Sequence, residues 1–314
     1  MRESGPSLGA RLFVAVQYLL PHHALSGVMY RLARVRWRPL KDLLIATLLR
    51  LYRIDMTEAA DPNPKSYAHF NAFFTRALRA DARPAEPDPQ AVVSPVDGTV
   101  SQCGLITAGR LIQAKGRYFT VAELLGGDPE QARAFIGGTF ATIYLAPSDY
   151  HRIHMPLGGD LAWMRHLPGR LFSVNAATAD LVPRLFARNE RVVCRFETDL
   201  GAMAMVLVGA IFVGGIETVW AGEVTPANAR SQPSSRLAGG GSVRLERGAE
   251  MGRFNLGSTV ILLFEPGRVQ LDETLLPGRK IRLGQRLGAP AASPERIEIR
   301  GEPETDACLI SSLP

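Results

Sequence analysis

Three short stretches of the sequence hold residues whose types and spacing could do chemistry. Gly257 and Ser258 stand at the start of an apolar run, His151 and His154 lie three residues apart after a turn, and Asp97 precedes a glycine between two strand-like pieces. A serine becomes a nucleophile when a base takes its proton and an acidic group orients that base. The order Asp, His, Ser along a chain carries no geometry, so this chemistry needs further support.

Each stretch also has a purely structural explanation. A glycine before an apolar run is typical of the start of a strand, and Asp-Gly is typical of a hairpin turn whose carboxylate bonds its own backbone. The two histidines are half of a metal site, but no cluster of Cys, His or carboxylate residues with ligand spacing accompanies them. We therefore expect no metal cofactor.

The pattern of apolar residues changes near residue 60, from helical spacing to short strand-like runs, and divides the chain into two regions. In residues 1–60, apolar residues recur at helical spacing in three segments, and the first segment ends at Pro21. A further short helix is predicted over 67–78 and helical insertions over 176–187, while the small polar residues of 225–241 predict a mobile loop. From residue 92 onward, short runs of Val, Ile and Phe between Gly and Pro predict strands, among them 92–93, 99–100, 141–145, 192–196, 203–208, 211–213 and 259–264.

These patterns predict an α+β fold: a mainly antiparallel β barrel or sandwich core, with N-terminal amphipathic helices and a few helical insertions. The predicted domains are residues 1–60, which form the basic amphipathic helices, and residues 61–314, which form the β-rich domain. Three widely spaced cysteines without a Cys-x-x-Cys pair fit a reducing compartment.

The positive charge is concentrated at the N-terminal end. Residues 1–53 hold nine bases and two acids, a net charge of +7, so the rest of the chain sums to −1 because the whole carries +6. Basic amphipathic helices lie on anionic membranes, although packing on the protein's own core is the alternative. The arginines are interleaved with Leu, Ile and Val, which argues against nucleic acid as a partner. Residues 12–30 are too polar for a spanning helix, which needs ~20 mainly apolar residues.

Several longer stretches together are much more specific than any motif alone. They are FNAFFTRALRADARP (70–84), SPVDGTVSQCG (94–104), IQAKGRYFTVAELLGG (112–127), YHRIHMP (150–156), LFSVNAATADLVPRLFARNERV (171–192), GGIETVWAGEVTP (214–226) and EMGRFNLGSTVILLFEPG (250–267). Through them the sequence resembles the bacterial, membrane-associated, pyruvoyl-dependent phosphatidylserine decarboxylases over nearly its whole length. One departure is Ala176, where the family often has a histidine after Ser-Val-Asn.

The resemblance implies that the chain cuts itself between Gly257 and Ser258, which yields a β chain, 1–257, and an α chain, 258–314. Ser258 would become a covalent pyruvoyl group, the cofactor of the reaction. His154 would take the proton of Ser258, and Asp97 would orient that histidine. His151 is assigned to stabilising or protonating the Schiff base during decarboxylation, or else to simple hydrogen bonding.

The substrate implied by the resemblance is phosphatidylserine in an anionic membrane, and the products are phosphatidylethanolamine and CO2. Because this lipid cannot leave the bilayer, we expect a peripheral enzyme on the cytoplasmic face of the cell membrane. A homodimer is a further expectation. Two alternatives stay open: a pyruvoyl decarboxylase of a soluble amino acid, and a non-catalytic β-barrel adaptor on the membrane surface.

Overall fold

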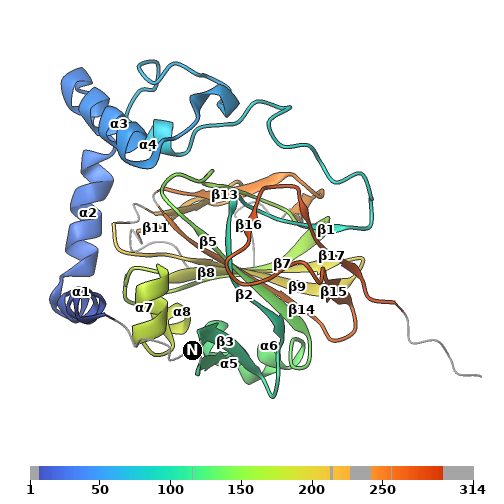
Figure 1. Cartoon of the computed structure of the whole chain (residues 1–314). Helices are drawn as coiled ribbons and strands as arrows, with labels where there is room; N and C mark the ends of the chain where they lie inside the picture. The colour runs from blue at the N-terminus through green and yellow to red at the C-terminus, as the bar shows by residue number, and fades with distance from the viewer. Residues whose placement is uncertain (1–6, 115, 213–214, 227–241, 256, 293–314) are drawn as a thin grey trace, which may run out of the picture.

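A computed structural model describes residues 7–114, 116–212, 215–226, 242–255 and 257–292 of the chain. Three helices at the N-terminus run along one side of the molecule (Figure 1): α1 (Leu8–Leu19), α2 (His22–Leu32) and α3 (Arg38–Tyr52). The side chain of Ser7 caps α1 by accepting a hydrogen bond from the Ala10 N–H, and α3 ends where Arg53 adopts a left-handed backbone. The three helices predicted from the apolar spacing are confirmed.

The largest sheet has eight strands in the order β12-β7-β8-β9-β14-β5-β2-β16, and all of its pairs are antiparallel. Smaller sheets have the orders β11-β10-β13-β6, β1-β17-β15 and β3-β4. The strands are β1 (Val92–Val93), β2 (Gly98–Leu105), β3 (Arg110–Ala114), β4 (Arg117–Thr120), β5 (Thr139–Leu145), β6 (Arg152–His154), β7 (Gly159–Leu167), β8 (Arg191–Thr198), β9 (Gly201–Val208), β10 (Ile216–Thr218), β11 (Gly222–Thr225), β12 (Arg244–Leu245), β13 (Glu250–Phe254), β14 (Ser258–Phe264), β15 (Val269–Leu271), β16 (Lys280–Ile281) and β17 (Arg286–Pro290).

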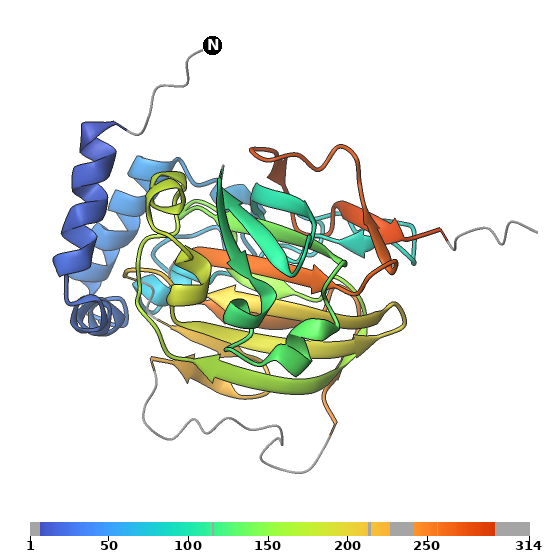
Figure 2. The same cartoon turned by 90° about the horizontal axis from the view of Figure 1, so that it is seen from below.

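The eight-stranded sheet is covered on both faces, which explains why β14 is an unbroken apolar run. Successive side chains of a strand point to opposite faces. Val260 and Leu262 accordingly join a core shared with the four-stranded sheet, whereas Ile261 and Leu263 join a core under the short helices. Figure 2 shows these helices on the near face of the sheet; they are α5 (Val121–Leu124), α6 (Pro129–Arg133), α7 (Ala176–Leu181) and α8 (Leu185–Arg188).

The predicted α+β fold is confirmed in its sandwich form. Among the described residues the eight-stranded sheet keeps two open edges, at β12 and β16, so it does not close into a barrel. The helical insertions predicted over 176–187 are present as α7 and α8. Residues 227–241, most of the predicted mobile loop, lie outside the described residues.

Three local predictions need correction. The helix predicted over 67–78 is shorter, α4 (Phe70–Phe74), because Leu78 forms a β-bridge with Ala59 instead of continuing the helix. Phe212, predicted within a strand, lies in a turn with φ +64°. Lys41 is one of the nine bases of residues 1–53, which the amphipathic pattern places on the polar face of the helices, but it is buried, and its ammonium group bonds the Asp42 carboxylate and the Lys65 carbonyl.

Candidate active site

Ser258 is the first residue of β14 and lies opposite Leu145, the last residue of β5. It is fully buried, and its Oγ has no hydrogen-bond partner among the described residues. A buried polar atom without a partner costs about 1–3 kcal/mol, so its retention indicates a function. Ser258 therefore has the position of a nucleophile held ready and protected from water.

Gly257 has a backbone φ of +22°, a conformation that side-chain-bearing residues rarely adopt. A Cβ built at this position would meet no heavy atom within 4 Å. The space on the side where a Cβ would stand is therefore open. The positive φ makes glycine the residue that fits here.

His151 lies just beyond the turn that leaves β5. Its Nδ1 is 2.7 Å from the carbonyl oxygen of Asp149, which can only accept, so Nδ1 carries the proton and Nε2 has a free lone pair. The ring is fully buried against Phe74, with 4.1 Å between ring centroids, and Nε2 has no partner among the described residues. Burial lowers the pKa of His151 to about 3, so the ring is neutral near pH 7.

His154 ends β6 and is engaged at both ring nitrogens. Nδ1–H donates to the Gly248 carbonyl at 2.8 Å, so Nε2 accepts from the Tyr150 hydroxyl at 3.2 Å. Burial lowers the pKa of His154 and raises the pKa of Tyr150 to about 12. His154 is thus a neutral base whose Nε2 is occupied by a tyrosine hydroxyl.

Asp97 is also engaged elsewhere. Its carboxylate accepts from Arg83 Nε at 2.9 Å and from the Leu283 N–H at 2.8 Å, and Arg83 also bonds Glu58 at 2.8 Å. Burial by itself would lower the pKa of Arg83, but its hydrogen bonds to the two carboxylates raise it. The negative charge of Asp97 acts on both histidines and raises the pKa of each, against the larger effect of burial.

The backbone brings these four residues to one end of the sandwich. The Phe254 N–H donates to the His151 carbonyl at 2.9 Å, four residues before Ser258, and the His154 N–H donates to the Pro95 carbonyl at 2.9 Å, two residues before Asp97. Among the described residues, no side-chain hydrogen bond joins Asp97 to His154, or either histidine to Ser258. The Asp97, His154 and Ser258 roles therefore stay predictions.

The structure adds residues that the sequence analysis did not single out. Tyr150 and Arg83 lie inside the quoted stretches 150–156 and 70–84 and directly contact His154 and Asp97. Arg247 precedes Gly248 and donates to the carbonyls of Asp88 at 2.6 Å and Ala91 at 3.2 Å. It thereby fixes the turn that holds His154 to the segment that leads to Asp97.

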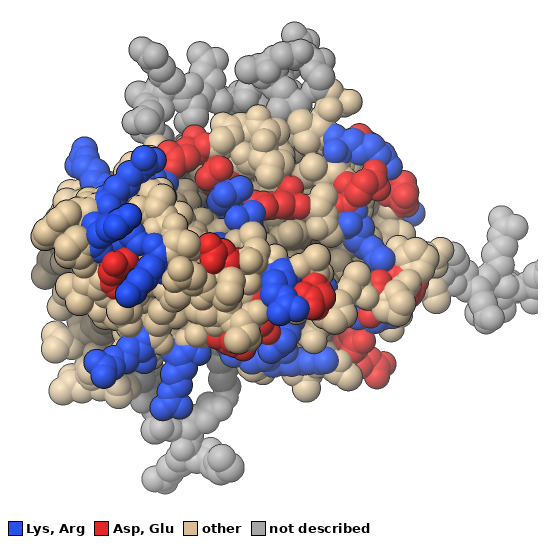
Figure 3. Space-filling view, turned by 90° about the horizontal axis from the view of Figure 1, so that it is seen from above, with Lys and Arg blue, Asp and Glu red and all other residues tan. Residues whose placement is uncertain are grey.

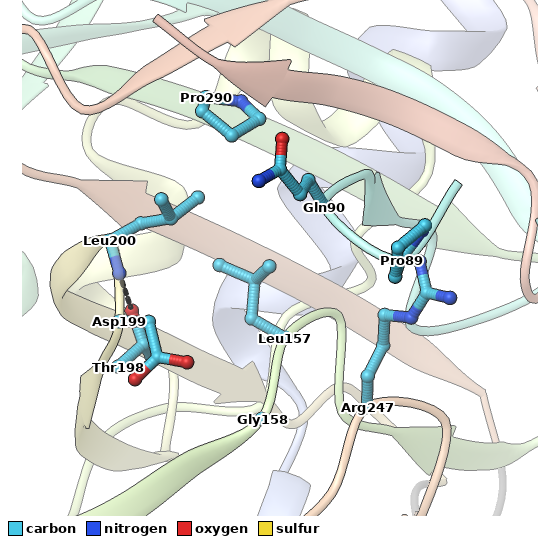
Figure 4. A pocket seen from close by; sticks show the side chains of 9 residues that line it. All are labelled: Pro89, Gln90, Leu157, Gly158, Thr198, Asp199, Leu200, Arg247 and Pro290. Carbon is cyan, nitrogen blue, oxygen red and sulfur yellow. Dashed lines mark hydrogen bonds between the residues drawn. The ribbon is translucent and has the colours of Figure 1, made fainter.

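Figure 4 shows Arg247 reaching toward Pro89 at the rim of a cavity of about 210 Å³. Leu157 and Leu200 lie on its walls, and none of the predicted site residues lines it. A larger cavity, of about 310 Å³, has Gly257 in its wall. Among the described residues, no three His, Cys, Asp or Glu side chains group as metal ligands would.

The burial of Ser258 decides what kind of protein this site belongs to. The Ser258 hydroxyl is fully buried, and the Gly257 carbonyl is the adjoining group in the chain. Fold and site together define a sandwich protein whose central strand starts with a buried serine hydroxyl that has no partner among the described residues, an arrangement that favours a reaction within the chain.

Comparison with known proteins identifies the family. Residues 70–289 match the phosphatidylserine decarboxylase family, and residues 12–53 match a family described as PSD. The phosphatidylserine decarboxylase proenzyme of Ectopseudomonas mendocina is 56% identical over 280 residues, which cover 88% of this chain and 98% of that one. The proenzyme of the same name from Bordetella pertussis is 54% identical over 286 residues, which cover 90% and 96%. The chain belongs to the phosphatidylserine decarboxylase family, as its motifs predicted.

Proposed function

We propose that this chain converts phosphatidylserine to phosphatidylethanolamine and CO2 after cutting its own backbone between Gly257 and Ser258. The observation that carries the proposal is the buried, unpartnered Oγ of Ser258 directly after an unhindered glycine. The relatives' names, which state both the decarboxylase and a proenzyme, support the reaction and the maturation. The products of the cut are the β chain, 1–257, and the α chain, 258–314.

In the self-cleavage that we propose, Ser258 Oγ bonds to the carbonyl carbon of Gly257 while the bond from that carbon to the Ser258 nitrogen breaks, which converts the amide to an ester. His154, neutral because burial lowers its pKa, takes the hydroxyl proton and passes it to the Ser258 nitrogen as that nitrogen leaves, and the charge of Asp97 stabilises the cation formed between the two transfers. Elimination at Ser258 then frees the carboxylate of Gly257, and water releases ammonia to leave the pyruvoyl group.

The orphaned hydroxyl and the open space at Gly257 fit a cofactor made in place from Ser258. A pyruvoyl group supplies a carbonyl that takes up the substrate's amine and accepts the electrons that CO2 leaves behind. His151 holds an unprotonated Nε2 in the dry interior at the same end of the sandwich. We propose that this atom first takes a proton from the substrate's ammonium group and then returns it to the substrate carbon that has lost CO2, and that the Phe74 ring excludes water around it.

The N-terminal helices support contact with a membrane surface. On α1, Leu8, Leu12 and Leu19 are 83%, 64% and 86% exposed, which is an apolar surface that no other described part of the chain covers. No single helix among the described residues has the length and apolar character to cross a bilayer; α1 and α2 reach both only together, across a bend of 89°.

Basic side chains accompany this apolar surface. Figure 3 shows Lys and Arg gathered on the left of the upper face, where α3 lies. The exposed bases of this region are Arg11, Arg31, Arg36, Arg38, Arg50 and Arg53. Each base placed near anionic lipid adds about 1 kcal/mol of attraction. We propose that the three helices lie on the cytoplasmic face of the cell membrane, which brings the enzyme to its lipid.

Intact-mass measurement of the purified protein tests the maturation. We expect two polypeptides that divide at Gly257 and Ser258, the smaller with a blocked N-terminus that reacts with ketone reagents, and we expect Ser258→Ala to stay whole. An active wild-type protein of one full-length mass would overturn the proposal. Release of CO2 from phosphatidylserine vesicles but not from free serine tests the substrate, and light scattering of the same sample tests the expected homodimer.

A further inference from the structure

A cavity of about 310 Å³ lies between α1 and the end of the sheet where Ser258 begins β14. One wall is formed by Phe13, Val16 and Gln17 of α1 and by Leu20, which follows the helix, and Leu145 and Gly257 also line the cavity. The volume is at the low end of the roughly 300–1,000 Å³ of ligand cavities, so it suits a part of a ligand. The lining is mainly apolar, and the cavity touches the glycine of the processing bond.

Gln17 is the residue that holds this wall in place. It is 2% exposed, its Oε1 accepts from the Ser173 N–H at 2.8 Å, and its Nε2 donates to Thr178 Oγ1 at 3.3 Å. Ser173 itself lines the cavity, and Thr178 belongs to α7 behind it. Both ends of one amide therefore join the N-terminal helix to the segment that closes the cavity.

His22, at the start of α2, reinforces the same connection. The Leu171 N–H donates to its Nδ1 at 3.2 Å, which leaves Nε2–H to donate to the Gln17 carbonyl at 2.7 Å. Backbone groups of residues 171 and 173 are thus bound by two neighbouring side chains of the helical region. The adjoining side of α1, about a quarter turn around the helix, presents Leu12 and Leu19 to the surroundings.

We propose that Gln17 is a positioning residue: it fixes α1 as the wall of a cavity that takes the apolar part of the phospholipid beside the reacting group. The proposal rests on the proposed function and deepens it. Because Gly257 lines the cavity, the cavity lies next to the atoms that react. The same helix, α1, also exposes apolar side chains to the surroundings, so a lipid that leaves the membrane surface can stay in contact with α1 until it reaches the cavity. A small soluble amino acid would not need this wall.

Gln17→Met tests the proposal because methionine keeps the length of the side chain and a good helix propensity but forms neither hydrogen bond. Thr178→Val removes the same contact from the other side, and Ala15→Ser, on an exposed position of α1, is the matched control. For each variant we would measure self-cleavage by mass, partition onto phosphatidylserine vesicles, thermal unfolding, and kcat and KM for decarboxylation on those vesicles.

We expect Gln17→Met to raise KM about tenfold, the size of one or two buried hydrogen bonds, with kcat, self-cleavage and partition unchanged. Thr178→Val should raise KM less, because it removes only one of the two hydrogen bonds of Gln17. The double variant should be no worse than Gln17→Met, because the contact with Thr178 is already lost in that variant. An unchanged KM in both single variants, or a loss of partition that accounts for the higher KM, overturns the proposal. A wild-type protein that releases no CO2 from phosphatidylserine overturns the proposed function instead, so the two failures are distinguishable.

Discussion

The ring of His151 is neutral because it is fully buried, where a charged form is unfavourable. Its Nδ1–H satisfies the Asp149 oxygen, and Nε2 faces the interior without a partner among the described residues. A histidine in this state can accept a proton but resists being charged, since burial opposes the cation. The same property that suits it for proton transfer links the stability of the fold to pH.

His151 should make the protein sensitive to acid. In the unfolded chain its pKa is near the ordinary 6.5, whereas the folded value is about 3, so the unfolded state binds the proton first as pH falls. The contribution of the neutral ring is therefore complete above pH 6.5 and is lost between pH 6.5 and 3, at up to about 1.4 kcal/mol per pH unit.

Urea unfolding at several pH values between 6.5 and 3 measures the unfolding free energy of wild type and of His151→Asn. We expect it to fall more steeply with decreasing pH in wild type. Asparagine keeps an N–H near the position of Nδ1, so the contact with Asp149 can persist. The other histidines with lowered pKa, His154, His22 and His69, occur in both proteins and cancel in the comparison. Equal pH slopes for the two proteins would show that His151 is not a buried neutral group.

Asp97 should be needed both for stability and for self-cleavage. Asp97→Asn leaves the largely buried Arg83 side chain with Glu58 as its one carboxylate partner among the described residues, and the loss of one partner of a buried ion pair costs about 3 kcal/mol. It also removes the charge that raises the pKa of His154, so we expect self-cleavage to slow at least ~100-fold.

Asp88→Asn is the matched control, because Asp88 also pairs with an arginine, Arg286, but both side chains are much more exposed. Processing is followed by gel or mass against time, and stability by urea unfolding. Normal maturation of Asp97→Asn would remove Asp97 from the self-cleavage chemistry.

At the scale of the elements, the spacing of apolar residues was sufficient to predict helices and strands whose structure depends mainly on burying their own apolar side chains. The three N-terminal helices and β14 follow from apolar spacing alone. The pattern failed at α4, because the Arg79 N–H reaches the Glu58 carbonyl and turns the chain away from the helix axis, a long-range contact that no periodicity contains. The prediction that Lys41 is exposed was wrong for the same reason, since the Lys65 carbonyl that its ammonium group bonds is distant in sequence.

The site was predictable to a similar extent. The motifs named Asp97, His151, His154 and Ser258, and backbone pairing brings their segments together. The partners that occupy them, Arg83 on Asp97 and Tyr150 on His154, depend on side-chain geometry. Spacing along the sequence does not encode that geometry.

The exposed apolar side of α1 carries a prediction of its own. Leu12→Gln with Leu19→Gln should weaken partition onto anionic vesicles at least tenfold, because burying one leucine in an apolar environment contributes about 1.5–3 kcal/mol. Both side chains point away from the protein, so self-cleavage and thermal stability should not change. Sedimentation with vesicles at low and high salt measures the partition.

Leu276→Gln is the control, since Leu276 is similarly exposed but lies outside the helical region. Its partition should equal that of wild type. If the α1 double variant also binds vesicles as tightly as wild type, then α1 does not face the membrane.

At the scale of the whole molecule, the proposed cut falls at the N-terminal end of β14, a central and fully buried strand of the eight-stranded sheet. All seven residues of β14 are buried, and the strand pairs with β5 on one side and with β9 on the other. Farther along the α chain, β16 pairs with β2, and β17 pairs with β1. Residues 258–292 are therefore an internal part of the sandwich, and we expect their neighbours in residues 1–257 to hold them by the same hydrogen bonds and packing after the proposed cut.

We expect from this arrangement that the two chains stay together once they are separate polypeptides. Matured protein should elute from a sizing column as one species in native buffer, and the α chain should leave only at denaturant concentrations that unfold the β chain, because removing β14 exposes both cores at once. Tryptophan fluorescence reports the unfolding of the β chain, where all three tryptophans lie, and mass analysis of the column fractions reports the α chain. Release of the α chain before the fluorescence transition would show that β14 does not hold the matured protein together.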